Sequence, residues 1–381
     1  MKVLFLHAAH IGLTPEYKVH ATLSSYACRK DFVPHYIWQS PIDATLFSDD
    51  QISTHDFGSR PQGGPITSRM RRRGAILRLF PNTMFFLASY VGQIRPDAIY
   101  TSQQRFDVLL GTLLSKRYQI PHIIHLHYNV GAWLGKFTLR AIRQSSRLIA
   151  VSEWVRQTAL LQGIDPAKIH TVINPVPVPQ PMSGRDGADI RAEFGIDAHA
   201  PLVLAVGRLD VWKGHLDLFN AFARVVRTMP TARLLICGAS TSGDHYDDIL
   251  RQRVRELNLQ SKVVFAGHRS DIRAIMRSAD VFCLPTIMDP CPLAFLEAMY
   301  EGLPVVAYYS GGVPEIVLPE RTGLLSYPGD LDTLAANLQM LLCDRAYARQ
   351  LGDAGAQRAM TEFAPATIAE RWLKVLGEKI N

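Results

Sequence analysis

The chain alternates short apolar segments with longer segments whose apolar residues recur at helical spacing. The helical segments include 215–228, 244–257, 292–300 and 331–342. The short apolar segments are 3–7, 98–101, 123–127, 148–151 and 169–173 in the first half, and 202–207, 234–238, 263–266, 281–284, 305–307 and 323–326 in the second. Nearly continuous apolar strands separated by helices are typical of parallel sheets covered on both faces. The pattern therefore predicts an α/β fold of doubly wound parallel sheets.

A proline-rich segment, residues 174–187, separates the two sets of predicted strands. Its alternating prolines are incompatible with a central strand or a helix interior, so we expect an extended linker. We predict Rossmann-like domains over 1–180 and 181–364, because 381 residues exceed one typical domain. The two domains are expected to face each other across a cleft, since open α/β sheets bind ligands beyond the carboxyl ends of their strands. The last helix, within 365–381, is compatible with either domain, and packing back on the first is the expectation.

Composition limits the compartment and the partners. Hydrophobic residues make up 48% and charged residues 20%, and no run of 18 apolar residues occurs, so no membrane-spanning helix is expected. The five cysteines are scattered without a CxxC pair, which argues for a cytoplasmic protein and against a disulfide framework or a zinc site. Residues 1–180 hold 20 of the 41 basic side chains but only 10 of the 34 acidic ones. A basic first half attracts phosphates, anionic lipid or nucleic acid.

Two carboxylates, Asp289 and Glu297, lie eight residues apart, the first just before an apolar helical segment and the second inside it. Backbone N–H groups and the helix dipole favour an anion such as a phosphate at a helix N-terminus. The carboxylates would then accept hydrogen bonds from hydroxyl groups attached to that phosphate, as in a nucleotide diphosphate sugar. The plainer alternatives are helix capping by Asp289 and a surface position for Glu297. We favour a buried Glu297 that binds ribose hydroxyls, because its neighbours are apolar.

Two cations, Arg208 and Lys213, lie on the loop that follows the first predicted strand of the second half. Arginine offers a planar fork to phosphate oxygens, and lysine offers a compact charge. In a site without bulk water, both could stabilise a departing diphosphate without a metal ion. The alternative is a solvated basic loop, which the acidic pair downstream makes less favourable.

Histidines and glycines follow two further predicted strands. His125 and His127 end the segment 123–127, and strand alternation places both imidazoles on one side. We favour a functional role for His127, while a metal pair is the weaker alternative because no third ligand is spaced to help. Gly311 and Gly312 follow the segment 305–307 and permit close approach of the backbone to a ligand. A simple strand-to-helix turn explains them equally well.

Together these motifs resemble those of the family-4 retaining glycosyltransferases of the GT-B fold. The resemblance rests on the Gly-Arg-Leu…Lys-Gly loop at 207–214, on a Glu-x7-Glu type signature that begins at Asp289 and runs into Leu-Glu-Ala-Met, and on the Gly-x-Pro-Val-Val turn at 302–306. Further matching segments are 121–127, 149–154, 267–269, 278–286 and 311–317. The resemblance covers nearly the whole chain and is most specific from 202 to 345. Asp289 stands where the family signature begins with Glu, which shortens the side chain by one methylene.

The resemblance implies a role for each matching residue. Arg208 and Lys213 would hold the donor diphosphate, Glu297 the ribose, and Asp289 the hydroxyls of the transferred sugar. His127 would lie beside that sugar at the reaction centre, and Gly12 would belong to the acceptor and diphosphate loop after the first strand. The implied catalytic residues are thus His127, Arg208, Lys213 and Asp289. The implied donor-binding residues are Gly207, Arg208, Lys213, His268, Arg269, Ile272, Asp289, Cys291, Pro292, Leu293 and Glu297, with His268, Arg269 and Ile272 around the base.

The implied reaction is the retaining transfer of a hexose-type sugar from a UDP- or GDP-sugar to a glycan, lipid-linked or small-molecule hydroxyl, without a metal or other cofactor. Synthesis of cell-surface polysaccharide or glycolipid is the expected context. The alternatives are a catalytically silent nucleotide-binding subunit, a sugar-nucleotide epimerase and a phosphorylase. A dinucleotide oxidoreductase is disfavoured because no G-x-G-x-x-G follows a predicted strand.

A basic segment, Arg69–Phe80, contains five arginines and no acidic residue, and apolar residues follow it. This combination is typical of an interfacial helix, so we expect docking on anionic lipid at the inner membrane face. A solvated helix with one buried side and a site for an acidic glycan are the alternatives. Nucleic acid is disfavoured because no recognition motif accompanies the charge.

Overall fold

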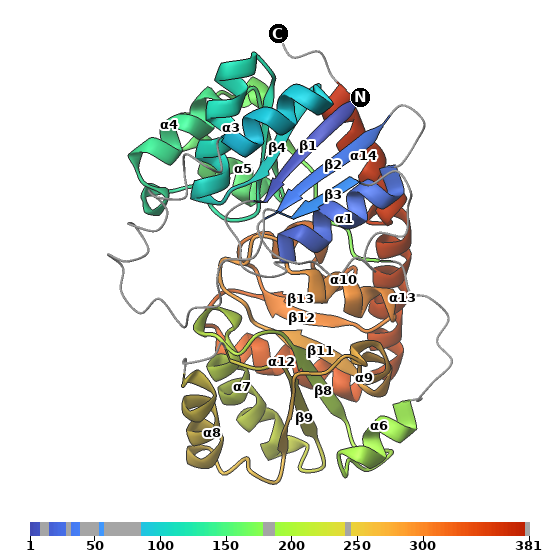
Figure 1. The fold of residues 1–381 in the computed structure, drawn as a ribbon. Helices are drawn as coiled ribbons and strands as arrows, with labels where there is room; N and C mark the ends of the chain where they lie inside the picture. Colours follow the sequence, from blue (N-terminus) through green and yellow to red (C-terminus); the bar gives the residue numbers. More distant parts are fainter. Residues whose placement is uncertain are drawn as a thin grey trace. The chain divides into compact units, whose positions relative to one another are not determined.

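The computed structural model describes residues 1–7, 15–27, 32–38, 53–56, 85–177, 187–240 and 245–377. The chain divides into two compact units, one formed by Met1–Pro175 with Pro365–Asn381 and the other by Val176–Ala364. The C-terminal helix is therefore part of the first unit. Each unit is built on one sheet of parallel strands, as the apolar pattern predicts (Figure 1).

The first unit holds a seven-stranded sheet in the order β3-β2-β1-β4-β5-β6-β7. Its strands are β1 (Lys2–His7), β2 (Val33–Trp38), β3 (Ser53–Asp56), β4 (Ala98–Ser102), β5 (His122–Leu126), β6 (Arg147–Ala150) and β7 (Ile169–Thr171). The apolar pattern does not predict β2 or β3. Pro34 pairs with Val3 inside the sheet, where a proline argues against a strand because it lacks an N–H donor. The sequence of β3 is Ser-Thr-His-Asp, which has no apolar run.

Helices cover both faces of this first sheet. They are α1 (Pro15–Ala27), α3 (Arg105–Tyr118), α4 (Lys136–Gln144), α5 (Glu153–Leu160) and α14 (Pro365–Gly377), with a further helical segment over 85–94. Leu4 and Leu6 of β1 belong to a buried cluster with residues of that segment and of α3. Phe5 alternates to the opposite face and stacks 6.1 Å from Trp372 of α14, between ring centroids. The first core therefore depends on a helix from the far end of the chain.

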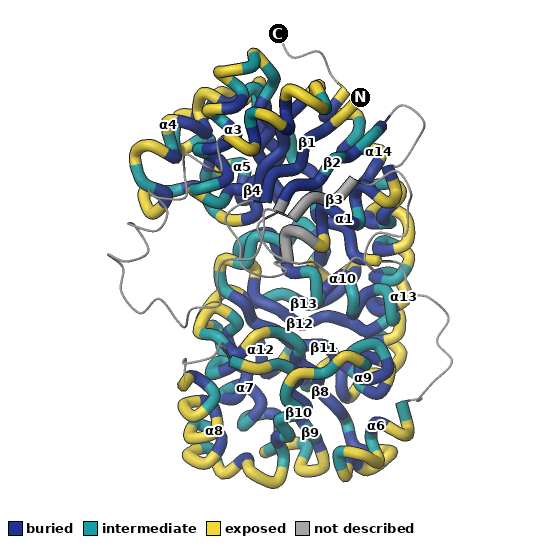
Figure 2. Tube along the Cα trace, viewed as in Figure 1, coloured by how far each residue is buried: buried dark blue, intermediate teal, exposed yellow. Residues whose placement is uncertain are grey.

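The second unit holds a six-stranded sheet in the order β10-β9-β8-β11-β12-β13. Its strands are β8 (Leu202–Val206), β9 (Arg233–Cys237), β10 (Val263–Gly267), β11 (Val281–Leu284), β12 (Val305–Tyr308) and β13 (Gly323–Ser326). Its helices are α6 (Gly187–Glu193), α7 (His215–Thr228), α8 (Tyr246–Glu256), α9 (Ile272–Ser278), α10 (Leu293–Tyr300), α11 (Val313–Ile316), α12 (Leu331–Cys343) and α13 (Arg345–Glu362). The strands are largely buried and helix α8 is exposed along its outer side (Figure 2).

The order of strands in the second sheet reverses at β8 and β11. From β8 the chain proceeds outward through β9 to β10, and it then returns to β11 and proceeds the other way to β13. Helix α7 packs against α8 and α12, while α10 packs against α9 and α13. In doubly wound sheets, ligands bind beyond the carboxyl ends of the strands at such a reversal. We therefore expect a binding site at the loops that follow β8 and β11.

Candidate functional site

Lys213 and Asp289 come together at the reversal point of the second sheet. Lys213 ends η4 (Val211–Lys213), the short 3-10 helix after β8, and Asp289 follows β11. The Lys213 Nζ atom lies 2.5 Å from Oδ2 of Asp289, and the two side chains are 21% and 10% exposed. The sequence predicts a role for each residue, and the structure joins them as a partly buried ion pair.

Hydrogen bonds between the two loops hold this ion pair in place. The backbone N–H of Ile287 donates to the carbonyl of Trp212 at 2.8 Å, and the Thr286 hydroxyl donates to the same carbonyl at 3.0 Å. The backbone N–H of Cys291 donates to Oδ1 of Asp289 at 3.3 Å. Cys291 therefore contributes a backbone donor beside the carboxylate.

A glycine loop packs directly on the backbone of Asp289. Gly311 has a φ of +58°, and a Cβ atom there would lie 2.4 Å from the carbonyl oxygen of Asp289. The N–H of Gly312 donates to that oxygen at 2.8 Å, and the hydroxyl of Ser310 accepts from the N–H of Met288 at 2.9 Å. The two glycines thus allow their loop to pack closely on the backbone of Asp289, rather than on a ligand.

The Arg208 side chain is 71% exposed, so it is much more open to solvent than the ion pair. Its Nη2 atom lies 3.1 Å from Oδ2 of Asp210. The other carboxylate oxygen of Asp210, Oδ1, caps η4 by accepting from the N–H of Trp212 at 3.0 Å. The preceding Gly207 donates its N–H to the carbonyl of Cys237 at 3.0 Å, which ties this loop to β9. An exposed guanidinium on a fixed loop is available to an anionic ligand.

Helix α10 begins at Leu293, directly after the loop that carries Asp289. Pro292 is its N-cap residue, and no side chain caps the first turn. Glu297 is half-buried, between Leu296 and Ala298, which are fully buried. The backbone donors of an uncapped first turn suit an anion, as the sequence predicts for this helix.

Two family models match the chain: Glycosyltransferase Family 4 over residues 41–179 and Glycosyl transferases group 1 over residues 186–358. The alpha-maltose-1-phosphate synthase of Mycolicibacterium smegmatis is 30% identical over 299 residues, which are 70% of this chain and 75% of that protein. The chain belongs to the family-4 glycosyltransferases. A lipopolysaccharide core biosynthesis glycosyltransferase of Rhizobium meliloti is 28% identical to this glycosyltransferase over 197 residues, 52% of this chain and 56% of the relative.

The solved structure of Anabaena HepE in complex with UDP matches the whole of this glycosyltransferase and the whole of that chain, with a TM-score of 0.81 and 22% sequence identity. At this identity the likeness shows the fold. The α/β architecture with two parallel sheets is therefore confirmed as the GT-B fold that the motifs imply.

The residues expected around the base of a donor follow β10 in this glycosyltransferase. Arg269 places its guanidinium 2.8 Å from Asp271 and 2.8 Å from Glu193, and the hydrogen bonds to these carboxylates raise the arginine pKa. His268 is exposed, and Ile272 is half-buried at the start of α9. Arg269 therefore forms ion pairs with two carboxylates of its own unit.

The glycosyltransferase also buries a group of histidines in its first unit, and sequence reasoning found only part of it. His125 of β5 and His127 just after it face the same side, with ring centroids 4.1 Å apart, as alternation predicts. His20 of α1 places Nε2 3.1 Å from Nδ1 of His125 and 3.1 Å from Nε2 of His127. Its Nδ1 lies 3.2 Å from Nε2 of His7, the last residue of β1. No sequence spacing pointed to His7 or His20, because they lie on other elements.

Burial controls the protonation of these imidazoles. Desolvation is the main cause that lowers the pKa of His20 and of His125, and the neighbouring histidines lower both further. The Trp372 indole N–H donates to the hydroxyl of Tyr100 at 3.0 Å, and that oxygen lies 2.8 Å from Nδ1 of His125. Around neutral pH both histidines are therefore uncharged.

Two of the predicted features lie outside the described residues, namely Gly12 and the basic segment Arg69–Phe80. Among the helices that the structure describes, none combines the length and the apolar character needed to cross a membrane.

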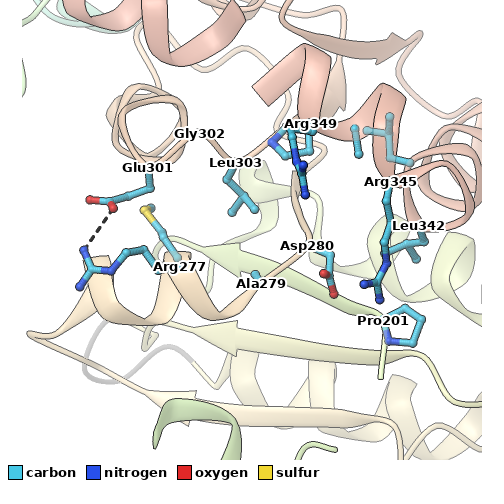
Figure 3. Close-up of a pocket in the computed structure, with 14 residues that line it drawn as sticks. Pro201, Arg277, Ala279, Asp280, Glu301, Gly302, Leu303, Leu342, Arg345 and Arg349 are labelled. Carbon is cyan, nitrogen blue, oxygen red and sulfur yellow. Dashed lines mark hydrogen bonds and ion pairs between the residues drawn. The ribbon is translucent and has the colours of Figure 1, made fainter. Parts of the chain in front are cut away.

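A separate cavity of about 440 Å³ lies at the amino ends of strands of the second sheet (Figure 3). Its lining includes Pro201, Asp280 and Pro304, which directly precede β8, β11 and β12. Arg277 and Glu301 on its wall form an ion pair at 3.2 Å. The amino ends of the strands border this cavity, so it is not part of the Lys213–Asp289 site.

Proposed function

We propose that this glycosyltransferase moves a hexose-type sugar from a UDP- or GDP-sugar to a hydroxyl acceptor, with retention of anomeric configuration and without a metal ion in the transfer step. The observation that carries the proposal is the partly buried Lys213–Asp289 pair at the reversal point of the second sheet. The Anabaena structure with UDP, and another of the same protein with UDP-glucose, support a nucleotide-sugar donor.

The ion pair suggests how the donor is bound. A diphosphate carries more negative charge than one carboxylate, so it competes with Asp289 for the ammonium group of Lys213. When Lys213 turns to the diphosphate, Oδ2 of Asp289 is released to accept a hydrogen bond from a sugar hydroxyl. Arg208 adds a second cation from the same loop, and the half-buried Glu297 binds the ribose hydroxyls.

The transfer step forms a bond between the acceptor oxygen and the anomeric carbon on the face from which the phosphate leaves. The bond between that carbon and the phosphate oxygen breaks, and the acceptor proton passes to the leaving phosphate. Lys213 and Arg208 stabilise the charge that develops on the diphosphate. His127 acts beside the transferred sugar in this proposal.

We also propose a carbohydrate or lipid-linked acceptor, in the synthesis of cell-surface polysaccharide or glycolipid. The lipopolysaccharide relative of Rhizobium meliloti supports this context. Docking on anionic lipid through Arg69–Phe80, from the cytoplasmic side, would bring the enzyme to such an acceptor. This part predicts that vesicles containing anionic lipid sediment the protein at low salt.

A thermal-shift comparison of UDP, GDP, ADP and TDP tests the donor site. A ligand that binds only the folded state, at 100 times its dissociation constant, adds about 2.7 kcal/mol of stability. We expect a selective rise in melting temperature with UDP or GDP, followed by transfer or slow hydrolysis of the matching sugar donor. The absence of any shift in folded protein would contradict the donor site. A shift without transfer or hydrolysis would instead favour a silent nucleotide-binding subunit.

A further inference from the structure

Three buried histidines of the first unit, His20, His125 and His127, form what we call the histidine cluster. They come from α1, from β5 and from the residue after β5, and each offers one ring nitrogen within 4.8 Å of the others. Their exposed fractions are 0%, 0% and 7%. The ring nitrogens therefore meet inside the protein, where each needs a partner other than bulk water.

The distances in the histidine cluster suit a metal ion. With metal–nitrogen bonds of about 2.0–2.1 Å, two ligands of a tetrahedral ion lie about 3.3 Å apart. Nε2 of His20 lies 3.1 Å from the nearest nitrogens of both His125 and His127. An ion at the centre of this group would meet three lone pairs, whereas a single proton on Nε2 of His20 is shared between two acceptors.

The surroundings of the histidine cluster bear on the tautomers of two of its ligands. The Trp372 indole can only donate, so the Tyr100 hydroxyl accepts from it, and the same oxygen lies 2.8 Å from Nδ1 of His125. For His125 to bind an ion through Nδ1, its proton must be on Nε2 and the Tyr100 hydroxyl must turn its proton away from Nδ1. Nδ1 of His20 lies 3.2 Å from His7, so the proton of His20 can move to Nδ1 and bind His7. Metal-binding histidines commonly donate their second N–H in this way.

We propose that the histidine cluster binds one divalent first-row transition-metal ion, with Zn²⁺ as the expected occupant. Imidazole nitrogens select such ions over Mg²⁺ and Ca²⁺, which prefer oxygen ligands. All three ligands belong to the first unit, whereas the Lys213–Asp289 pair belongs to the second. Sequence spacing alone offers His125 and His127 without a third ligand, and the fold supplies His20 from α1.

Metal binding has a consequence for catalysis that rests on the proposed function. His127 cannot bind an ion and a sugar hydroxyl through the same nitrogen, so the loaded protein should transfer sugar more slowly. Nucleotide binding by the second unit should not change. Equal transfer rates for loaded and metal-free protein would contradict this consequence, while direct metal binding tests the site itself.

The test uses the full chain without an affinity tag, stripped by a chelator and titrated with Co²⁺. Ligand-field absorption reports tetrahedral Co²⁺, and Zn²⁺ should displace it with a stoichiometry of one ion per chain. His20→Gln and His127→Gln should each weaken binding by at least about tenfold, since even loss of a supporting partner costs that much. The matched control is His199→Gln, because His199 is exposed in the second unit and should leave binding unchanged.

Folding of each variant is checked by its melting temperature and by its nucleotide-induced thermal shift. That shift depends on the second unit, so it also separates failure of the proposed function from failure of the metal site. Failure of the folded, stripped wild-type protein to bind one ion would overturn the proposal. Binding that is as tight in His20→Gln and His127→Gln as in the wild type would overturn it equally. If one of these variants does not fold, the other decides.

Discussion

At the scale of single residues, the proposed donor binding depends on competition between a diphosphate and Asp289 for Lys213. Its ammonium group is held by Asp289 at 2.5 Å in a partly buried position, while Arg208 remains mostly exposed. Removal of the lysine therefore does two things. It takes away a charge that would bind the proposed donor diphosphate, and it separates Asp289 from the ammonium group that it contacts.

We expect Lys213→Ala to lower the turnover number by about 10²–10³-fold, the usual effect of losing one preorganised charge donor. Lys262→Ala is the control, because Lys262 directly precedes β10 and so lies at the amino end of that strand, whereas the site lies at the carboxyl ends. Initial rates at saturating donor measure the effect. Equal rates for Lys213→Ala and the wild type would refute the assignment.

Glu297→Ala should behave differently from Lys213→Ala. The proposed partner of Glu297 is the ribose, which does not change during transfer, so its loss should raise the KM for the donor more than it lowers kcat. Rates across a range of donor concentrations separate the two constants. A fall in kcat at unchanged KM would argue against ribose binding.

His122 makes the stability of the first unit sensitive to acid. It is buried beside the hydroxyl of Thr101 at 3.0 Å, and burial lowers its pKa from 6.5 to about 3. The unfolded histidine binds a proton below pH 6.5 while the folded one does not, so stability is complete above that pH and falls toward pH 3. Between pH 7 and pH 5 the titration of this residue should lower the free energy of unfolding by about 2 kcal/mol.

The experiment is urea unfolding at pH 7 and at pH 5. His122→Gln should lose less stability than the wild type over this interval, because glutamine does not titrate. His199→Gln, at an exposed position, should lose as much as the wild type. An unchanged pH dependence in His122→Gln would show that His122 is not the source.

At the scale of elements, the site depends on close contacts among the loops that follow β8, β11 and β12. The glycine loop after β12 supports the carbonyl of Asp289, and the loop after β8 accepts donors from the loop after β11. These contacts hold the backbone of Asp289 and of its neighbours in place. Backbone geometry at Gly311 is therefore part of the site.

Gly311→Ala should disturb the site, whereas Gly195→Ala should only add backbone strain. Both glycines have positive φ angles, +58° and +62°, which cost a side chain about 1–2 kcal/mol. A Cβ atom at Gly311 would also meet Asp289, while nothing lies within 4 Å of one at Gly195. We expect weaker nucleotide binding, measured calorimetrically, in Gly311→Ala alone. Equal affinity in the two variants would contradict this role.

At the scale of the whole molecule, the first unit is completed by the end of the chain. Trp372 of α14 is fully buried against Tyr100 and Phe5, which lie on neighbouring strands of the first sheet. Trp372→Ala should lower the stability of the first unit by about 3–5 kcal/mol. The second unit keeps its own sheet and core, so its nucleotide-induced shift should persist. Scanning calorimetry with and without nucleotide tests this, and loss of the shift would contradict independent units.

The sequence by itself determined most of the elements and named candidates for the site. Apolar runs and helical spacing are local properties, so helix 215–228 was predictable to its bounds, as were the strands of the second sheet to within about one residue. The loop residues could also be named, because ligands bind where parallel strands end. The pattern misses β2 and β3, since strand pairing overrides the unfavourable Pro34 and the polar residues of β3.

Only the tertiary structure decided which residues meet. Lys213 and Asp289 are 76 positions apart, and His20 and His125 are 105 apart, so no spacing rule connects them. Their contacts follow from strand order, which places β8 beside β11 and puts β4 between β1 and β5. They also follow from the position of α1, whose His20 lies against Phe5 of β1. Strand order is a global outcome of packing and connection rules. For this reason only the folded structure shows that His20 joins His125 and His127, and that Lys213 pairs with Asp289.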